Sequence, residues 1–115
     1  MIIKKIVDVP VQEVKMEGAQ NVVVQKPITL KDNSPNFAMR VFTIKPGGNT
    51  PYHIHDFEHL NYVISGVGGI KREDGTVETI KEGDFILVFP NEKHQYLNLG
   101  KSNFKMICAV PIEDD

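Results

Sequence analysis

Short apolar runs, many of them rich in β-branched residues, recur along this chain and are separated by Gly, Pro, Asn and Asp. Such runs are typical of β-strands. Asp74 and Gly75 lie between two of these runs and predict a tight hairpin. Residues 46–48, with the sequence Pro-Gly-Gly, are expected to end the run that starts at residue 37. The pattern predicts strands over residues 2–9, 22–28, 37–45, 53–65, 70–73, 76–81, 85–89, 94–99 and 104–110.

No apolar stripe with helical spacing persists through ten residues of the sequence. The single candidate for a helical turn covers residues 11–17. Many short strands at regular spacing, interrupted by Gly and Pro, favour an all-β sandwich or barrel. Because no repeat, low-complexity stretch or linker divides the chain, we expect one domain over residues 1–115.

Composition and charge narrow the classes of function. Hydrophobic residues make up 41% of the 115 residues, which suffices for a core without disulfides, and the single cysteine cannot form one within the chain. The formal net charge is -2 and no basic block occurs, so we expect no nucleic-acid partner. No apolar run approaches the ~20 residues of a membrane-spanning helix, so we expect no membrane partner. The first residues lack the apolar stretch of a secretory signal, which favours a cytoplasmic location.

The four histidines of the chain carry the strongest chemical signal, because three of them lie within seven residues. Residues two apart on a strand point to the same face, so His53 and His55 project together. His59 shares their parity, whereas Glu58 falls on the opposite face if the strand continues. His94 begins another predicted strand. This consistent parity predicts one divalent metal ion bound by four imidazoles, in preference to four unrelated surface or core histidines.

The same parity predicts a pocket around the histidines. Asn61 shares the face of His59, and Tyr96 shares the face of His94. On the last strand, Met106 and Cys108 are expected to point into the barrel, because Lys105 marks the other face as outward. Cys108 could pair with a histidine as a nucleophile, but its apolar run raises the pKa of a thiol, which favours a small buried side chain without chemistry. Tyr96 is the one side chain of this set with the character of a general acid or base.

The spacing around these histidines resembles the two motifs of the cupin superfamily. In the first motif the sequence matches Gly47, His53, His55 and Gly66, with His59 where the superfamily usually has glutamate. The stretch from Gly83 to His94, followed by Asn98, resembles the second motif. There Pro90 falls one residue later than usual, and Asn91 replaces the usual turn glycine. Asn is the residue other than Gly that best tolerates a left-handed backbone.

A histidine in place of the glutamate is similar to a subgroup of small cupins whose manganese ion is held by four histidines. The resemblance implies a jelly-roll barrel of two antiparallel sheets and one divalent ion. The resemblance favours Mn or Fe(II), and Ni, Cu and Zn are further candidates because imidazole also suits these metals. The resemblance also implies that Arg40 and Phe42 face the cavity, although the alternation of residues along their strand does not decide which face points inward. A surface ion pair is the alternative for Arg40.

Function is less specified than fold, because cupins host many reactions. Our leading expectation is a metal-dependent oxidoreductase of the dioxygenase type that acts on a small, weakly polar substrate. The alternatives are a non-redox isomerase or lyase acting on a small sugar or keto acid, and a module that binds a small ligand without catalysis. We also expect a homodimer, because Phe37, Met39 and Val41 would form an apolar outer face that needs covering.

Overall fold

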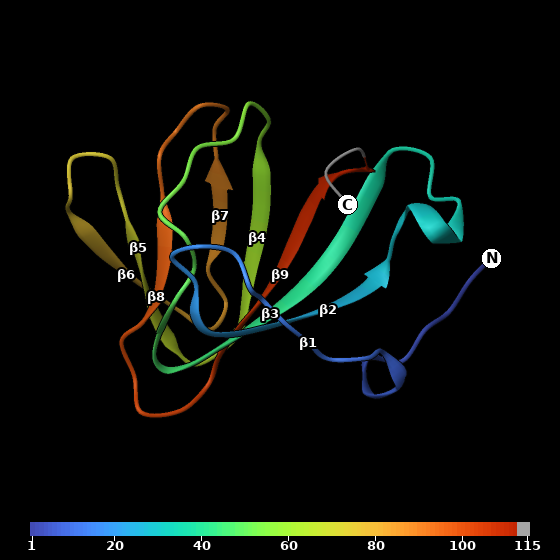
Figure 1. Ribbon diagram of the computed structural model, residues 1–115, viewed down its shortest axis with the longest axis horizontal. Coiled ribbons are helices and arrows are strands. Elements are labelled where there is room, and N and C mark those ends of the chain that lie inside the picture. The colour runs from blue at the N-terminus through green and yellow to red at the C-terminus, as the bar shows by residue number, and fades with distance from the viewer. Residues whose placement is uncertain (113–115) are drawn as a thin grey trace.

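The computed structural model describes residues 1–112 and folds them into one curled antiparallel sheet (Figure 1). Along the main path of this sheet the strand order is β6-β5-β8-β3-β9-β4-β7, and β2 pairs with both β1 and β3. The all-β jelly-roll barrel predicted from the sequence is therefore confirmed. The strands of this range are β1 (Gln12–Glu13), β2 (Gln20–Ile28), β3 (Phe37–Asn49), β4 (His59–Ser65), β5 (Val67–Lys71), β6 (Val77–Lys81), β7 (Phe85–Val88), β8 (Gln95–Asn98) and β9 (Phe104–Pro111).

Strand β3 is the central strand of the barrel, because it pairs with β2, with β9 and, at its end, with β8. It continues through residues 46–48, so the prediction that these residues end the strand is wrong. The register against β2 shifts in this stretch, as at a β-bulge. A Cβ at Gly48 would lie 2.6 Å from the carbonyl oxygen of Gln20, so this glycine lets the two backbones approach. Here glycine bends a strand rather than ending it.

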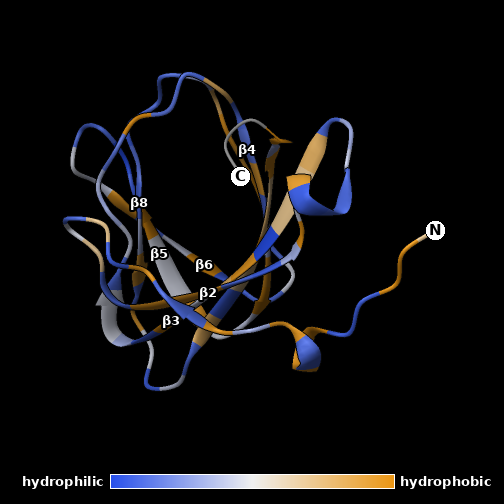
Figure 2. Cartoon of the chain, turned by 45° about the vertical axis from the view of Figure 1, so that its right-hand side comes forward, coloured by the Kyte–Doolittle hydropathy of each residue, from blue (hydrophilic) through white to orange (hydrophobic). Residues whose placement is uncertain are grey.

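The N-terminal segment departs most from its prediction. Neither the strand over residues 2–9 nor the helical turn over residues 11–17 is present; instead Ile6–Asp8 forms the 3-10 helix η1 and β1 is a two-residue strand. The segment leaves the barrel and runs outward (Figures 1 and 2). Its apolar residues therefore lack a neighbouring strand, and Ile3 and Val7 are 83% and 85% exposed. None of the helical segments in residues 1–112 is long and apolar enough to cross a membrane.

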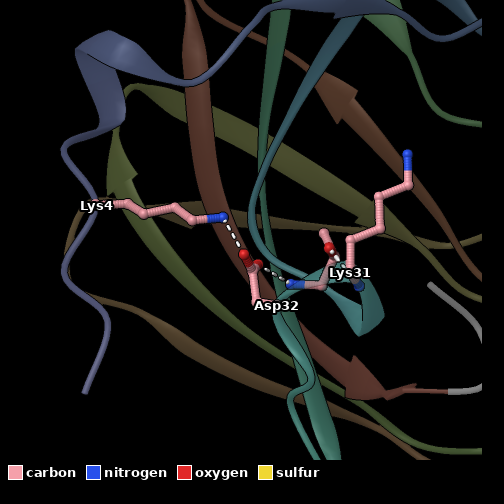
Figure 3. Close-up of polar contacts among 4 residues, drawn as sticks. Lys4, Lys31 and Asp32 are labelled. Carbon is pink, nitrogen blue, oxygen red and sulfur yellow. Dashed lines mark hydrogen bonds and ion pairs between the residues drawn. The ribbon is translucent and has the colours of Figure 1, made fainter.

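A capped turn holds this outlying segment (Figure 3). The 3-10 helix η2 (Leu30–Asp32) begins with a capping box. In it the side chain of Thr29 accepts a hydrogen bond from the backbone at the start of the helix, and the side chain of Asp32 accepts one from the backbone N–H of Thr29. The Asp32 carboxylate also lies 2.6 Å from the Nζ atom of Lys4. Hydrogen bonding from Lys4 and from the backbone lowers the pKa of Asp32, so the carboxylate stays charged and keeps the contact.

The hairpin predicted at residues 74–75 is confirmed between β5 and β6. Arg72 N–H donates to the carbonyl of Thr76 at 2.8 Å, and the side chain of Asp74 accepts from the backbone N–H of Thr76 at 2.9 Å. Gly75 has a φ of 89°, a conformation that L side chains rarely adopt. Strand β6 lies at the edge of the sheet, and β5 joins it to β8.

The main hydrophobic core fills one half of the barrel. The predicted strands over residues 85–89 and 104–110 are confirmed as β7 and β9, and both contribute to it. A smaller buried cluster of Ala38, Cys108 and Val110 lies in the other half. The main core consists of Val22, Ile44, Val63, Ile70, Ile80, Val88, Tyr96, Phe104 and Met106.

The stretch predicted as one strand over residues 53–65 is a strand only from His59 onward. Before that point the chain is irregular and bends at residues 56–57, and its link to the sheet is an isolated bridge between His53 and His94. Pro51 lacks the N–H that a ladder needs, which helps to keep this stretch out of the sheet. Two of the four histidines therefore lie on an irregular segment instead of a strand.

Candidate metal centre

Hydrogen bonds fix the irregular histidine segment against the strands beside it. The N–H of His53 donates to the carbonyl of His94 at 3.1 Å, and the N–H of His94 donates back at 3.0 Å. The carbonyl of His55 accepts from Asn91 at 2.5 Å. Asn91 has a φ of 66°, the left-handed backbone expected at this position. The turn after β7 and the start of β8 thus hold both histidines of the segment in place.

Three imidazoles converge on one point. The metal-ligating nitrogens of His53, His55 and His94 lie within 4.8 Å of one another. The Nε2 atoms of His53 and His55 are 3.0 Å apart. Two nitrogens bound at about 2.1 Å to one ion, at a right angle, would lie about 3 Å from each other. Nδ1 of His94 lies 2.8 Å from the carbonyl of Glu92, and donation there leaves the Nε2 lone pair for a metal. The donor set therefore fits a divalent transition metal.

His59 lies beside this group of three. Its ring stacks on that of His55, with centroids 4.2 Å apart and planes 14° apart. Its Nδ1 lies 3.5 Å from the sulfur of Cys108. Its Nε2 is buried and has no hydrogen-bond partner among residues 1–112. Buried polar atoms are nearly always satisfied, so this nitrogen indicates a missing partner. The neighbouring Glu58 is exposed to solvent.

Three of the four histidines, His55, His59 and His94, are held in the neutral form that metal binding requires. Burial lowers the pKa of His59 to about 3, and the nearness of His55 and His94 adds to this because protonated rings would repel one another. Burial is also the main cause that lowers the pKa of His55 and that of His94. Their ring nitrogens accordingly offer lone pairs at neutral pH instead of protons.

The histidines line a cavity of about 310 Å³. The structure places all six residues of the predicted pocket around it: Arg40, Phe42, Asn61, Tyr96, Met106 and Cys108. Sequence reasoning missed Val14, Met16, Lys26, Thr50 and Pro51, which also line it. Lys26 shares the parity of Val22 and Val24 on β2, so alternation could have identified it. Val14 and Met16 come from the segment misread as a helical turn, where no periodic signal was available.

Tyr96 and Asn61 form a closed hydrogen-bonded pair in the wall of the cavity. The hydroxyl of Tyr96 donates to Oδ1 of Asn61 at 2.8 Å, and Nδ2 of Asn61 donates to the carbonyl of Ile107 at 3.4 Å. Burial raises the pKa of Tyr96 well above its ordinary value. The phenol therefore keeps its proton and shares it with Asn61, which makes Tyr96 a fixed donor and unsuited to act as a base.

Two comparisons with solved structures place this arrangement among known folds. The polyketide cyclase RemF from Streptomyces resistomycificus superposes with a TM-score of 0.92 at 26% identity, over 97% of this chain and 80% of that one. A protein from Thermotoga maritima described as a predicted oxalate decarboxylase superposes with a TM-score of 0.85 at 17% identity, over 96% of this chain and 99% of that one. The second likeness shows the fold alone.

Similarity in sequence gives a closer grouping. A stretch of 52 residues, 45% of this chain, is 40% identical to an (R)-mandelonitrile lyase from Granulicella tundricola. The match spans 40% of the length of that relative. The family model described as a cupin domain matches residues 40–110, a range that contains all four histidines and the six predicted pocket residues. This match covers more than half of the sequence, and the chain belongs to the cupin domain family.

Proposed function

We propose that this cupin is a metal-dependent enzyme of the lyase type, which makes or breaks a bond in a small organic substrate without net oxidation. The observation that carries the proposal is the convergence of three imidazoles on the wall of a cavity of about 310 Å³. The names of the similar proteins, a lyase and a cyclase, favour such chemistry over the dioxygenase-type oxidation expected from the sequence.

We further propose that His59 is the fourth metal ligand. Its buried Nε2 lacks a hydrogen-bond partner among the described residues, and its ring lies against that of His55. An ion at this point would satisfy the nitrogen. Mn or Fe(II) are the ions that we expect, and Ni, Cu and Zn are compatible with the same imidazoles. Elemental analysis of untagged protein identifies which ion is bound after purification.

The cavity walls define what the chain itself contributes to the reaction. A divalent ion in this site supplies a Lewis acid for a carbonyl or hydroxyl oxygen of the substrate. Phe42 and Met106 give the cavity an apolar wall that excludes water from the reacting group. Tyr96 holds its proton and, with Asn61, forms a rigid polar edge that orients the substrate. The volume suits a molecule of a few carbon atoms or a single ring.

The ligand set is tested by comparing two adjacent residues. We expect His59→Ala to lower the Mn²⁺ affinity by about 100-fold or more, because loss of even an outer partner of a ligand costs 10–100-fold. Glu58→Gln is the matched control, since Glu58 is exposed and lies next to the usual position of the acidic ligand. Titration calorimetry with MnCl2 measures both. Loss of affinity in Glu58→Gln with none in His59→Ala would assign the ligand to Glu58 and refute this part of the proposal.

The reaction type is tested with metal-loaded protein, an oxygen electrode and two probes: the neutral mandelonitrile and the anionic keto acid oxaloacetate. We expect metal-dependent turnover of a probe without oxygen uptake, and its loss in His55→Ala. Oxygen uptake in proportion to product would instead support the dioxygenase-type function. Failure to turn over either probe would count against an enzyme and favour a module that only binds a small ligand.

We also propose that two copies of the chain pair through the outer face of the sheet. Met39, Leu60 and Leu87 lie on neighbouring strands in register, with Ala109 between the first two. All three of these large side chains are exposed, and exposed apolar patches of this kind mark interfaces. Light scattering is expected to give a dimer mass that Leu60→Glu lowers. Val77→Glu, on the distant strand β6, is expected to leave the mass unchanged; a monomer in the unmodified protein would refute the pairing.

A further inference from the structure

We propose that Met16 is a specificity-determining residue of this site, which covers the outer end of the cavity and selects substrates whose far end is apolar. The inference rests on the proposed metal-dependent function and adds the chemical class of the substrate. Met16 lines the same cavity as the four histidines, yet it is 58% exposed. Of the other apolar residues in this wall, Phe42 is half-buried, and Met106 and Cys108 are buried. Met16 is therefore the wall residue placed to lose contact with water when a ligand enters.

The loop between β1 and β2 fixes the backbone of Met16 and leaves its side chain adaptable. The carbonyl of Met16 accepts a hydrogen bond from the N–H of Ala19 at 3.1 Å. The carbonyl of Gly18 accepts one from Nδ2 of Asn49, at the end of β3, at 2.7 Å. On the other side of Met16, Val14 packs against the main core. A methionine held in this way presents a flexible, polarisable thioether, which can follow the outline of an apolar ligand.

The uncharged polar side chains of the wall direct their hydrogen-bond donors at the protein itself. The hydroxyl of Tyr96 donates to Oδ1 of Asn61 at 2.8 Å, and the hydroxyl of Thr50 donates to the carbonyl of the next residue at 3.5 Å. Nδ2 of Asn61 lies 3.4 Å from the carbonyl of Ile107 and 3.9 Å from the sulfur of Met106. A substrate oxygen placed against these groups would lose its water without gaining one of these donors, which costs free energy.

The cavity therefore treats the two ends of a substrate differently. Of the cations in its wall, Lys26 is exposed to solvent and Arg40 takes part in interactions within the protein. The polar end of a substrate is best satisfied at the histidines, and the remainder lies against Met16 and Phe42. This favours an alcohol or carbonyl compound that carries one aromatic ring or a branched alkyl group. It disfavours a sugar of the same size, whose further hydroxyls would meet an apolar wall.

The test uses Mn²⁺-loaded protein and two probes with the same number of non-hydrogen atoms, benzyl alcohol and the polyol erythritol. We expect titration calorimetry to show tighter binding of benzyl alcohol. Met16→Ala is expected to weaken the binding of benzyl alcohol by about tenfold and to leave that of erythritol unchanged, because small changes of apolar contact in a pocket are worth about one power of ten or more. Met16→Leu keeps the apolar surface and should restore most of the affinity.

Val11→Ala is the matched control, since Val11 is 61% exposed on the same segment and lies outside the cavity. It is expected to change neither affinity. Equal weakening of both probes in Met16→Ala, or no change in either, would overturn the inference. Tighter binding of erythritol by the unmodified protein, or no binding of benzyl alcohol, would overturn it as well.

Repeating the titrations without metal separates the two proposals. A protein that binds no Mn²⁺ but prefers benzyl alcohol through Met16 would refute the metal-dependent function and still support this inference. A protein that binds Mn²⁺ through its histidines and shows no effect of Met16 on either probe would refute this inference alone. Thermal unfolding of each variant shows that it is folded, as expected for changes at an exposed side chain.

Discussion

Strands β3 and β9 run through both halves of the barrel, the packed half around the main core and the hollow half around the cavity, and their inward side chains differ between the two. In one half, Ile44 on β3 pairs with Phe104 on β9, and both are fully buried in the main core. The next inward row of the same two strands pairs Phe42 with Met106. The row after that pairs Arg40 with Cys108, at the wall of the cavity. The backbone ladder is continuous between these rows. Side-chain chemistry alone therefore converts a packed half into a hollow one.

The packed half tolerates little added volume. A Cβ at Gly68 would come within 2.6 Å of the Phe104 ring, and one at Gly66 would come within 2.5 Å of the carbonyl oxygen of Asn103. Close packing of this kind makes the half sensitive to any change of volume. The hollow half keeps about 310 Å³ of space, so its side chains can be exchanged with smaller structural consequences. The comparison predicts that stability depends on one half and metal binding on the other.

The largest expected effect is in the packed half. Phe104→Ala removes a fully buried aromatic ring and should lower the free energy of unfolding by about 3–5 kcal/mol. Urea denaturation measures the loss, and Lys105→Ala, on the outward face of the same strand, is the control. The folded fraction of Phe104→Ala should bind Mn²⁺ with unchanged affinity. A large loss of affinity there would show that the two halves are coupled.

The complementary change is made in the hollow half. His94→Ala should lower the Mn²⁺ affinity by more than about 100-fold. It should change the stability of the metal-free protein by no more than about 1.5 kcal/mol, because it removes one hydrogen bond, from Nδ1 to the Glu92 carbonyl. Gln95→Ala removes a similar bond, to the Thr50 carbonyl, and should leave metal affinity unchanged. The opposite ranking of the two variants in metal titrations would refute the assignment of His94.

The halves also differ in how well the sequence predicts them. The strand β9 follows from its alternating pattern because one whole face is buried, so periodicity records its environment. Cys108 and Asn61 could be placed by alternation for the same reason. The strands β3 and β7 are buried less regularly, and their apolar runs alone predict them. These strands carry most of the fold and part of the site.

The remainder of the site depends on residues that periodicity does not describe. The sequence predicts that His53 and His55 are strand residues, yet they lie on an irregular segment held by two backbone hydrogen bonds to His94 and one to Asn91. Two-residue spacing still brings their rings together, because an extended backbone is enough for this. The N-terminal segment was misread because its β-branched residues have strand propensity but no neighbouring strand to pair with.

Acid should destabilise the metal-free protein through the hollow half. Because burial and neighbouring charges lower the pKa of His59 from 6.5 to about 3, the unfolded chain binds a proton that the native state does not bind between those pH values. Stability is then fully present above pH 6.5 and falls as the pH decreases toward about 3. We expect a loss of about 1–2 kcal/mol between pH 7 and pH 5, measured by urea denaturation.

The control for the pH effect is His59→Gln, which fills the same space without a titrating ring. Its stability should decrease less between pH 7 and pH 5 than that of the unmodified protein. Equal slopes in the two proteins would show that groups other than His59 cause the acid sensitivity.

The smallest expected effect concerns Cys108, in the wall of the hollow half. Its sulfur lies 3.5 Å from Nδ1 of His59, so it can accept the Nδ1 proton and leave Nε2 for the metal. Cys108→Val removes this acceptor and should lower Mn²⁺ affinity about tenfold, whereas Cys108→Ser retains an acceptor and should lower it less. Competition with a chelator measures both. If the valine variant binds Mn²⁺ as tightly as the unmodified protein, Cys108 only packs as a small buried side chain and does not position His59.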